Sequence, residues 1–287
     1  MPEPRGDHPS SGLDLTRLLG DRGTVGAIGE RNEYVLSKDW SGERERLRLL
    51  EATVDAFSVA AIRAAGFSRG CRCLEIGAGS GSIATWFAQE AGDPALVTAT
   101  DIDPRLLKPL AHEGIRVLEH DVVTDDFPPD SFDVIHARTV LEHVAQREEV
   151  LDRIVPWLTP EGVLLIVDCA SFPVFTSRNP IYRKAMQAWV DVLALSGTDY
   201  EWTRTFPQPL QRHGYRDVGA SAMVPAMQGG TPMARFWSLS LETLRPRILD
   251  AKLISAEEIN QAQRLLADPQ FWDLGPGFLA AWGRRPH

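Results

Sequence analysis

One glycine-rich stretch constrains the fold of this chain more than any other. It reads Cys73-Leu74-Glu75-Ile76-Gly77-Ala78-Gly79-Ser80-Gly81-Ser82-Ile83-Ala84, which predicts a buried strand, a glycine turn and the start of a helix. Glycine adopts a positive φ at little steric cost and lets backbone N–H groups come close to a ligand. The positive end of the helix dipole would face the same place. The stretch therefore predicts a ligand-binding turn, of a kind shared by several classes of nucleotide-binding enzyme.

Strands and helices alternate from this turn onwards. Apolar strands are expected at 71–76, 95–100, 115–119, 132–137 and 163–167, with helices between them. Near-continuous apolar strands separated by helices are typical of a parallel sheet that is covered on both faces. Right-handed crossovers would place the carboxyl ends of these strands at one edge, where open α/β sheets bind ligands. We therefore expect an α/β fold with a doubly wound, mostly parallel sheet.

The remaining segments suggest how the chain is divided. Residues 1–30 have no hydrophobic period and predict a flexible N-terminal arm. Residues 31–70 predict a cap helix, and residues 71–287 the main domain. The apolar face of the cap helix would consist of Leu47, Leu50, Val54, Phe57 and Ala61. Two excursions, at about 169–202 and 225–276, leave from carboxyl ends of strands, so we expect them to form a lid and a substrate pocket.

Several further elements are expected in and after the excursions. Helices are predicted at about 181–195, 205–213 and 235–249, and strands at 215–224 and 278–282. Another helix should begin at Ser255, because Glu258 three residues later completes a capping-box pattern.

Charge and cysteine content exclude some classes of protein. The net charge of −9 and the pI near 5.3 oppose binding to nucleic acid or to an anionic membrane, which favour a basic surface. The three cysteines do not make a disulfide framework, and Cys71 and Cys73 lack a second ligand pair for zinc, so no metal is expected. With no long apolar run and no signal peptide, a cytoplasmic location is expected.

Three acidic residues stand at the expected strand ends. Glu75 precedes the glycines, and Asp101 follows about twenty residues after the turn, where a carboxylate accepts the ribose hydroxyls of a nucleoside. Asp121 ends the third strand, where it would meet the amino group of an adenine. A nicotinamide dehydrogenase would favour glycine or alanine at position 82 and no acid before the turn, whereas this chain has Ser82 and Glu75. A P-loop is excluded because no Gly-Lys-Ser/Thr follows.

Taken together, these motifs resemble those of the class I S-adenosylmethionine-dependent methyltransferases. The matching segments are Leu74–Gly81, Ala99–Pro104, Asp121-Val122, Phe132–Arg138, Leu141–Val144 and Leu158–Gly162. The resemblance covers about residues 70–170 and is nearest to the small-molecule branch of ubiquinone-biosynthesis-type and secondary-metabolite enzymes. It implies a Rossmann-like fold with a seven-stranded sheet and S-adenosyl-L-methionine as the cofactor.

The resemblance also assigns roles to individual residues. The amino-acid end of the cofactor would be held by Glu75, Gly77, Ala78, Gly79 and Gly81. Asp101 would bind the ribose and Ile102 would pack on the adenine, whose amino edge would meet Asp121 and Val122. Ala137 and Arg138 would line the methionine side. Tyr34 and Arg46 would belong to the cap over the cofactor, with Arg46 pairing either with the methionine carboxylate or with glutamates of its own helix.

Methyl transfer requires an aligned nucleophile and often a base. By the resemblance, His143 and Asp168 are the catalytic candidates, with His136 as the runner-up. His143 has an alternative role as a packing residue. The place where enzymes that methylate nucleic-acid amino groups carry an Asn/Asp-Pro-Pro-Tyr/Phe motif here holds His136-Ala137-Arg138. The aromatic residues of the excursions favour a flat or greasy small-molecule acceptor, methylated most plausibly on oxygen.

Three rival functions stay open from the sequence. The first is a non-methylating cyclisation or rearrangement, which would use the same cofactor site. The second is a nicotinamide oxidoreductase, which Ser82 and Glu75 oppose. The third is a non-catalytic scaffold, which would bind neither cofactor saturably. A monomer and a homodimer are equally compatible with the chain.

Overall fold

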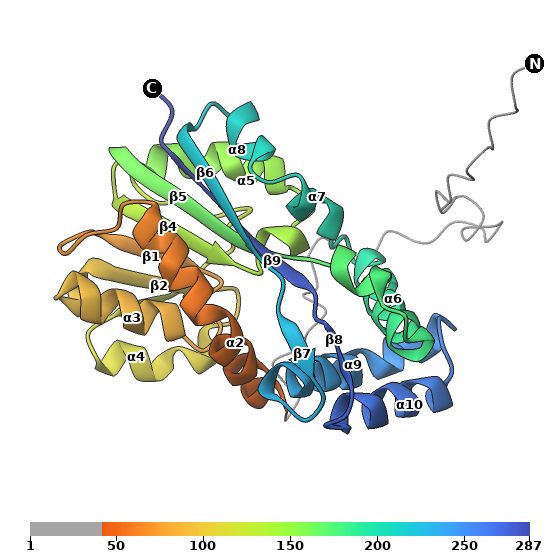
Figure 1. Cartoon of the computed structure of the whole chain (residues 1–287). Coiled ribbons are helices and arrows are strands. Elements are labelled where there is room, and N and C mark those ends of the chain that lie inside the picture. Colours follow the sequence, from red (N-terminus) through yellow and green to blue (C-terminus); the bar gives the residue numbers. More distant parts are fainter. Residues whose placement is uncertain (1–41) are drawn as a thin grey trace, which may run out of the picture. The chain divides into compact units, whose positions relative to one another are not determined.

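A computed structural model describes residues 42–287 of the chain, and the predicted N-terminal arm and Tyr34 lie outside this range. The main sheet has seven strands in the order β3-β2-β1-β4-β5-β9-β6 (Figure 1). These are β1 (Cys73–Ile76), β2 (Val97–Asp101), β3 (Arg116–Glu119), β4 (Phe132–Arg138), β5 (Leu158–Ala170), β6 (Arg216–Met223) and β9 (Gly277–Arg284). The first five pair in parallel, whereas β9 runs antiparallel to β5 and β6. The predicted α/β class and mostly parallel seven-stranded sheet are confirmed.

Helices connect the parallel strands. The first part of the chain forms α2 (Glu43–Ala64), α3 (Ser82–Ala91), α4 (Lys108–His112) and α5 (Arg147–Ile154), with short 3-10 helices η1 (Pro94–Leu96), η2 (Pro104–Leu106), η3 (Leu141–His143) and η4 (Val155–Trp157). Every fourth or so residue of α2 is buried, including the predicted Leu50, Val54 and Ala61. The period of 3.6 residues thus gives α2 one face for the sheet and one for solvent.

The two faces of the sheet carry separate hydrophobic clusters. Alternate strand residues such as Val134 and Leu165 pack with α2 and α3, and their neighbours Ile135 and Leu164 pack with α5. This division follows from the strand period of two, which sends successive side chains to opposite faces. Helices on both faces explain why the strands are apolar throughout.

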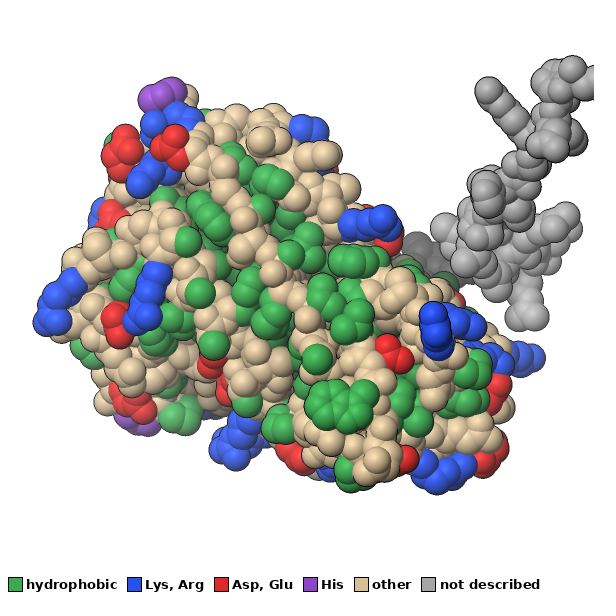
Figure 2. All heavy atoms as spheres, in the orientation of Figure 1, with side chains coloured by type: hydrophobic (Ala, Val, Ile, Leu, Met, Phe, Trp, Pro, Cys, Tyr) green, Lys and Arg blue, Asp and Glu red, His purple; other side chains and the backbone are tan. Residues whose placement is uncertain are grey.

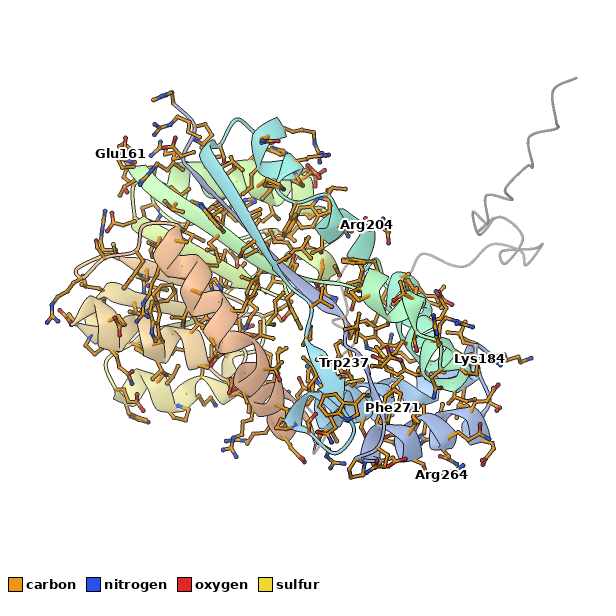
Figure 3. The ribbon with its side chains drawn as sticks, in the orientation of Figure 1. Glu161, Lys184, Arg204, Trp237, Arg264 and Phe271 are labelled. Atoms are coloured by element: carbon orange, nitrogen blue, oxygen red, sulfur yellow. The ribbon has the colours of Figure 1, made fainter. Side chains whose placement is uncertain are left out.

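The excursions contribute a further group of helices. Together with the segment between them, they form η5 (Phe172–Thr176), α6 (Pro180–Ala194), α7 (Tyr200–Arg204), α8 (Gln208–Arg212), α9 (Pro232–Asp250) and α10 (Ala256–Ala267). Two short strands, β7 (Ala226–Gln228) and β8 (Trp272–Leu274), pair antiparallel in a sheet of their own. Figure 1 shows α6, α9 and α10 gathered beside these strands, beyond one end of the main sheet. Trp237 and Phe271, labelled in Figure 3, are both buried in this group.

Some boundaries differ from those that the sequence predicts. The segment 159–162, which precedes the strand expected at 163–167, lies inside β5 and coincides with a register shift opposite Phe132 and Val134. The helix expected at 205–213 is the shorter α8, which follows the cis peptide bond Phe206–Pro207, and a separate helix, α7, precedes that bond. The capping box of Ser255 and Glu258 at the start of α10 is confirmed.

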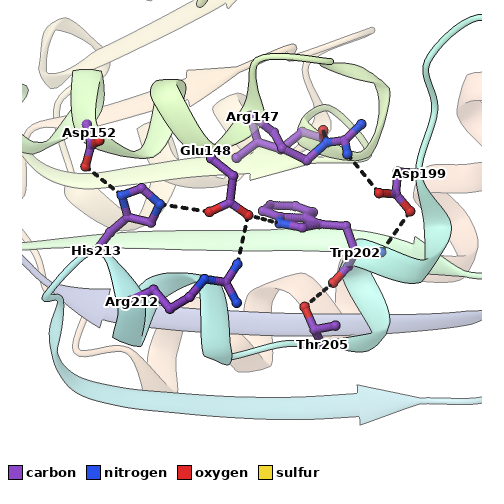
Figure 4. A network of polar contacts seen from close by, with 9 residues as sticks. Arg147, Glu148, Asp152, Asp199, Trp202, Thr205, Arg212 and His213 are labelled. Atoms are coloured by element: carbon purple, nitrogen blue, oxygen red, sulfur yellow. Dashed lines mark hydrogen bonds and ion pairs between the residues drawn. The ribbon is translucent and has the colours of Figure 1, made fainter.

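A polar network fastens α7 and α8 to α5. His213 lies between two carboxylates, with Nδ1 2.6 Å from Oδ1 of Asp152 and Nε2 2.8 Å from Oε2 of Glu148 (Figure 4). Oε1 of Glu148 accepts hydrogen bonds from Nε1 of Trp202 and from Nη2 of Arg212. One glutamate of α5 therefore contacts Trp202 of the first excursion and Arg212 and His213 of the segment that follows it.

On the face of the molecule shown in Figure 2, acidic and basic side chains are interspersed near the periphery and apolar atoms occupy much of the middle. Within residues 42–287, no helix combines the length and the apolar character that crossing a bilayer requires.

Candidate functional site

The glycine turn after β1 is shaped by backbone conformation. Gly77, Gly79 and Gly81 have φ values of 64°, 61° and 89°, in the region that favours glycine. The N–H of Ala78 donates to the carbonyl of Thr100 at 2.8 Å, which ties the turn to β2. The N–H of Gly81 donates to the carbonyl of Ala78 at 2.8 Å, and Gly81 is the N-cap of α3. Hydrogen bonds within the protein therefore fix the shape of the turn.

The end of β2 meets this turn through Asp101. Oδ2 of Asp101 accepts the N–H of Gly79 at 3.0 Å, and Oδ1 accepts the N–H of Asp103 at 3.0 Å. Each carboxylate oxygen has a second lone pair, so the side chain can still accept hydrogen bonds from a ligand. Ile102, the next residue, is 48% exposed. A carboxylate beside an exposed isoleucine fits the ribose and adenine positions that the sequence assigns to these two residues.

At the end of β3, the carboxylate of Asp121 takes part in a turn of its own backbone. Oδ1 of Asp121 accepts the N–H of Val123 at 2.9 Å, so this carboxylate stabilises its own turn. Val122 is buried in the cluster beneath α5. The contact of Asp121 and Val122 with an adenine stays a prediction.

Beneath the glycine turn lies a buried acid, Glu75. Its side chain is 2% exposed, and burial raises its pKa to about 8. Oε2 makes no hydrogen bond to any residue in the range 42–287, and Oε1 lies 3.8 Å from Nδ1 of His136 on the adjoining strand. Burial and the guanidinium of Arg138 lower the pKa of His136 to about 3. An unpartnered buried oxygen is costly, so a ligand group that donates to it would be stabilising.

Arg138 connects three elements at this edge. Its Nη1 donates to Oδ1 of Asp55 on α2 at 2.5 Å, and its Nη2 to Oγ of Ser82 on α3 at 3.2 Å. The hydroxyl of Ser80 donates to Glu51 of α2. These contacts hold α2 against the glycine turn. The side chain of Ala137 belongs to the opposite face of the sheet, in the cluster beneath α5, so Ala137 and Arg138 diverge.

Arg46 lies at the start of α2. Its guanidinium forms a bidentate pair with Glu43, with both N–O distances at 2.7 Å, and lies 5.5 Å from the ring centroid of Phe236. Both charged side chains are buried, Arg46 being 4% exposed. The structure therefore gives Arg46 the helical partner that the sequence offered as the alternative. Its pairing with a cofactor carboxylate stays a prediction, and Tyr34 lies outside the described residues.

His143 ends the short helix η3, directly after β4. Its Nδ1 lies 2.9 Å from Oγ1 of Thr198, and its Nε2 lies 3.2 Å from Oε1 of Glu142. Oε2 of Glu142 accepts the backbone N–H of Cys169. Burial lowers the pKa of His143 to about 4 and raises that of Glu142 to about 8. Both shifts favour the uncharged side chains.

Asp168, the second catalytic candidate, binds backbone. Its Oδ1 accepts the N–H of Val140 at 3.2 Å, and its Oδ2 accepts the N–H of Glu142 at 3.0 Å. The side chain is fully buried, and burial together with Glu142 raises its pKa. Asp168 and His143 lie at neighbouring strand ends, but the hydrogen bonds of Asp168 go to the turn that carries His143. The geometry describes Asp168 as a positioning residue, and its direct role in catalysis stays a prediction.

The turn at η3 packs directly on the glycine turn. A Cβ atom at Gly77 would overlap Cγ2 of Val140, the residue before η3. Asp168 holds Val140, and Val140 contacts Gly77, so the position of His143 is coupled to that of the cofactor turn.

Sequence reasoning missed several residues of this region. Asp55, Glu51, Glu142 and Thr198 come close to the predicted residues only through the fold. Asp55 and Arg138, for example, are separated by 83 positions. Of these four residues, only Glu142 could have been recognised from the sequence, because it stands beside His143 in a motif that matches the resemblance. Among residues 42–287, no group of three or more His, Cys, Asp or Glu side chains is placed to hold a metal ion.

Comparisons with known proteins concern the segment that carries the glycine turn. A family model described as a methyltransferase domain matches residues 74–164. Methyltransferase str3 of Strobilurus tenacellus is 41% identical over 98 residues, which are 34% of this chain and 35% of that protein. The ubiquinone/menaquinone biosynthesis C-methyltransferase UbiE of Azotobacter vinelandii is 30% identical over 37% of this chain and 46% of its own length. The chain thus spans less than half the length of these two relatives.

A solved structure extends the likeness of fold beyond the matched segment. The YcgJ protein of Bacillus subtilis superposes with a TM-score of 0.53 at 16% sequence identity, covering 79% of this chain and 97% of that protein. Residues 74–164 match a methyltransferase domain, and the comparisons together with the sheet order identify this segment as a domain of the class I S-adenosylmethionine-dependent methyltransferase kind.

Proposed function

We propose that this chain transfers a methyl group from S-adenosylmethionine to an oxygen atom of a small, flat acceptor in secondary metabolism. The observation that carries the proposal is the contact between the two turns at the strand ends. The turn of Gly77 supports the cofactor, and the turn of Val140 carries His143. Because the two turns touch, a base and a methyl donor would be held at the same edge of the sheet.

The residues at this edge have separate tasks in binding. Asp101 accepts the ribose hydroxyls, Ile102 covers the adenine, and the buried oxygen of Glu75 faces the amino-acid end. Arg138 stays paired with Asp55 and fixes α2 over the turn. The cofactor, when bound, supplies a methyl group on a positively charged sulfur.

His143 takes the proton from the acceptor hydroxyl in this proposal. Burial lowers the pKa of the imidazole to about 4, so the ring is uncharged at higher pH. Only the uncharged ring can accept a proton. Nε2 of the ring faces Glu142 and Nδ1 faces Thr198, so in this proposal the acceptor hydroxyl replaces one of these two contacts when it gives up its proton. Asp168 fixes the backbone of the turn.

The nature of the acceptor is supported by two observations. The excursions place buried aromatic side chains next to His143, including Tyr200, whose ring centroid lies 6.4 Å from that of His143. A relative is named a ubiquinone/menaquinone biosynthesis C-methyltransferase, which supports quinone-like ring compounds as the first acceptors to test, although that relative methylates carbon.

The test is a mass-spectrometric assay with S-adenosylmethionine and a panel of hydroxylated coumarins, naphthols and quinones. A product heavier by one methyl group on oxygen, with equimolar S-adenosylhomocysteine, is expected. A methyl group on carbon would overturn O-methylation, and an isomer of the acceptor with the cofactor unspent would replace methyl transfer by a rearrangement.

The role of His143 is tested in the same assay. We expect His143→Ala to lower kcat by about 10²–10⁴-fold, the usual contribution of a general base, with S-adenosylhomocysteine affinity preserved. His112→Ala, in the exposed end of α4, is the matched control. Wild-type turnover should fall only as the pH approaches about 4, because His143 becomes protonated there. Unchanged turnover in His143→Ala would remove this residue from the base role.

A further inference from the structure

Four aromatic rings of the excursions form a continuous series between two residues of the candidate site. We call this series the aromatic chain, and it consists of Tyr200, Trp189, Trp237 and Phe236. Tyr200 stacks on Trp189 with centroids 4.9 Å apart, and Trp189 meets Trp237 edge-on at 4.9 Å. Trp237 in turn contacts Phe236 at 4.8 Å.

The two ends of the aromatic chain lie at the predicted active site. Tyr200 meets His143 edge-on, and Phe236 lies beneath the guanidinium of Arg46. The charge of Arg46 also contributes to the lowered pKa of His143, after burial and against the opposing effect of Asp168. The rings therefore connect the surroundings of Arg46 with those of His143, although they come from α6, α7 and α9.

One member of the aromatic chain has an unused hydrogen-bond donor. Trp189 is 5% exposed, yet its indole Nε1 has no hydrogen-bond partner in the part of the chain from 42 to 287. Nearby indoles are satisfied: Trp237 donates to Sδ of Met233 at 3.0 Å, and Trp202 donates to Glu148 at 2.7 Å. A buried donor without an acceptor is destabilising, so its retention calls for an explanation.

We infer that Trp189 is a specificity-determining residue whose indole N–H donates to a carbonyl or carboxylate oxygen of the acceptor. The inference rests on the proposed function, because it places the acceptor beside Trp189 and within reach of His143. Aromatic rings favour flat ligands, which they contact by stacking or by their edges. The predicted ligand class is therefore a flat aromatic compound that carries a hydroxyl group for methylation and an oxo group for Trp189.

A site that offers a buried donor discriminates strongly against ligands without an acceptor. Two probes of similar size make this measurable, namely 7-hydroxycoumarin, which has a carbonyl group, and 2-naphthol, which lacks one. Affinities would be measured by calorimetry on the full chain saturated with S-adenosylhomocysteine.

The variant Trp189→Phe keeps a ring and removes the donor. We expect it to lower the affinity for 7-hydroxycoumarin by about three- to tenfold, which is the effect of one hydrogen bond. The affinities for 2-naphthol and S-adenosylhomocysteine should be unchanged. Trp157→Phe is the matched control, because Nε1 of Trp157 is also buried without a partner but packs beneath α5. It should leave both probes unchanged.

Three results would overturn the inference. They are equal weakening of the two probes by Trp189→Phe, unchanged binding of 7-hydroxycoumarin, and failure of the wild-type protein to bind either probe. Selective weakening in a protein that transfers no methyl group would instead uphold the subsite and refute the proposed function. The two proposals therefore fail separately.

Discussion

The turn after β1 and the aromatic chain hold their predicted ligands with different parts of the polypeptide. At the turn, three glycines with positive φ and the carboxylate of Asp101 set the shape, and the backbone N–H groups of Ala78, Gly79 and Gly81 donate to backbone carbonyls or to that carboxylate. In the aromatic chain, ring contacts between three helices set the shape, and the backbone takes no direct part.

The difference bears on which part of such a fold can change its ligand. A backbone turn tolerates few substitutions, because its geometry depends on residues without a Cβ. A wall of side chains can be rebuilt one residue at a time, with volume conserved, at modest cost in stability. We infer that the cofactor edge is the fixed half of this molecule and that acceptor choice resides in the excursions.

The largest expected effect comes from adding one carbon to the fixed half. In Gly77→Ala, a positive φ costs about 1–2 kcal/mol and overlap with Val140 adds about 1–3 kcal/mol, so the free energy of unfolding should fall by about 2–5 kcal/mol. Chemical denaturation would measure the change. Gly70→Ala is the control, since Gly70 has φ 87° and open space around its Cβ position. This variant should lose only the stability that the positive φ costs.

A second substitution separates the two parts of that cost. Val140→Ala in the Gly77→Ala background removes the overlap, so it should restore part of the lost stability and of the S-adenosylhomocysteine affinity. Equal costs for Gly77→Ala and Gly70→Ala would show that the two turns are not packed as the structure has them.

The next effect concerns Asp101, the side chain that accepts a backbone N–H of the glycine turn. Asp101→Asn keeps an acceptor for the N–H of Gly79 and removes the charge, so the affinity for S-adenosylhomocysteine should fall by about 1.5–3 kcal/mol, or about 10- to 150-fold. Titration calorimetry would measure it. Asp93→Asn, at the other end of β2, should leave the affinity unchanged, since Asp93 only caps η1. Unaltered binding by Asp101→Asn would displace the ribose from this carboxylate.

The same contrast explains what the sequence can predict. The sheet, the glycine turn and Asp101 follow from local patterns of strand, turn and helix, and the structure has these elements close to their expected limits. The strands β7 and β8 were missed because each has three residues, too few for a period, and 43 residues separate them along the chain. Their pairing depends on the packing of α9 and α10.

The candidate site shows the same limit. Arg138 was expected to line the cofactor, and its pairing with Asp55 required knowing that α2 crosses this face of the sheet. Asp168 was expected beside the acceptor, yet it accepts two backbone N–H groups of the turn before His143. A motif identifies a residue and its strand end, but the partner of its side chain comes from tertiary structure.

The smallest expected effect concerns the hydrogen bonds that attach α7 and α8 to α5. We call the excursions and these two helices the variable half of the molecule. Burial alone would lower the pKa of His213, but its hydrogen bonds with Asp152 and Glu148 outweigh burial and raise it. A raised pKa in the folded state stabilises the protein fully below the unfolded value, about 6.5, and this contribution is lost as the pH rises through the folded pKa. Both carboxylates are substantially exposed, so the contribution should not exceed about 1 kcal/mol.

This attachment can be loosened without touching the cofactor edge. Comparing the free energy of unfolding of wild type and His213→Gln between about pH 6 and pH 9 should give a difference that shrinks with rising pH, whereas His112→Gln should give none. If α7 moves when the bonds of His213 weaken, Tyr200 moves with it, and affinity for 7-hydroxycoumarin should fall over the same pH range while S-adenosylhomocysteine affinity stays constant. Parallel loss of both ligands would contradict the division into a fixed and a variable half, because it would couple the aromatic chain to the glycine turn.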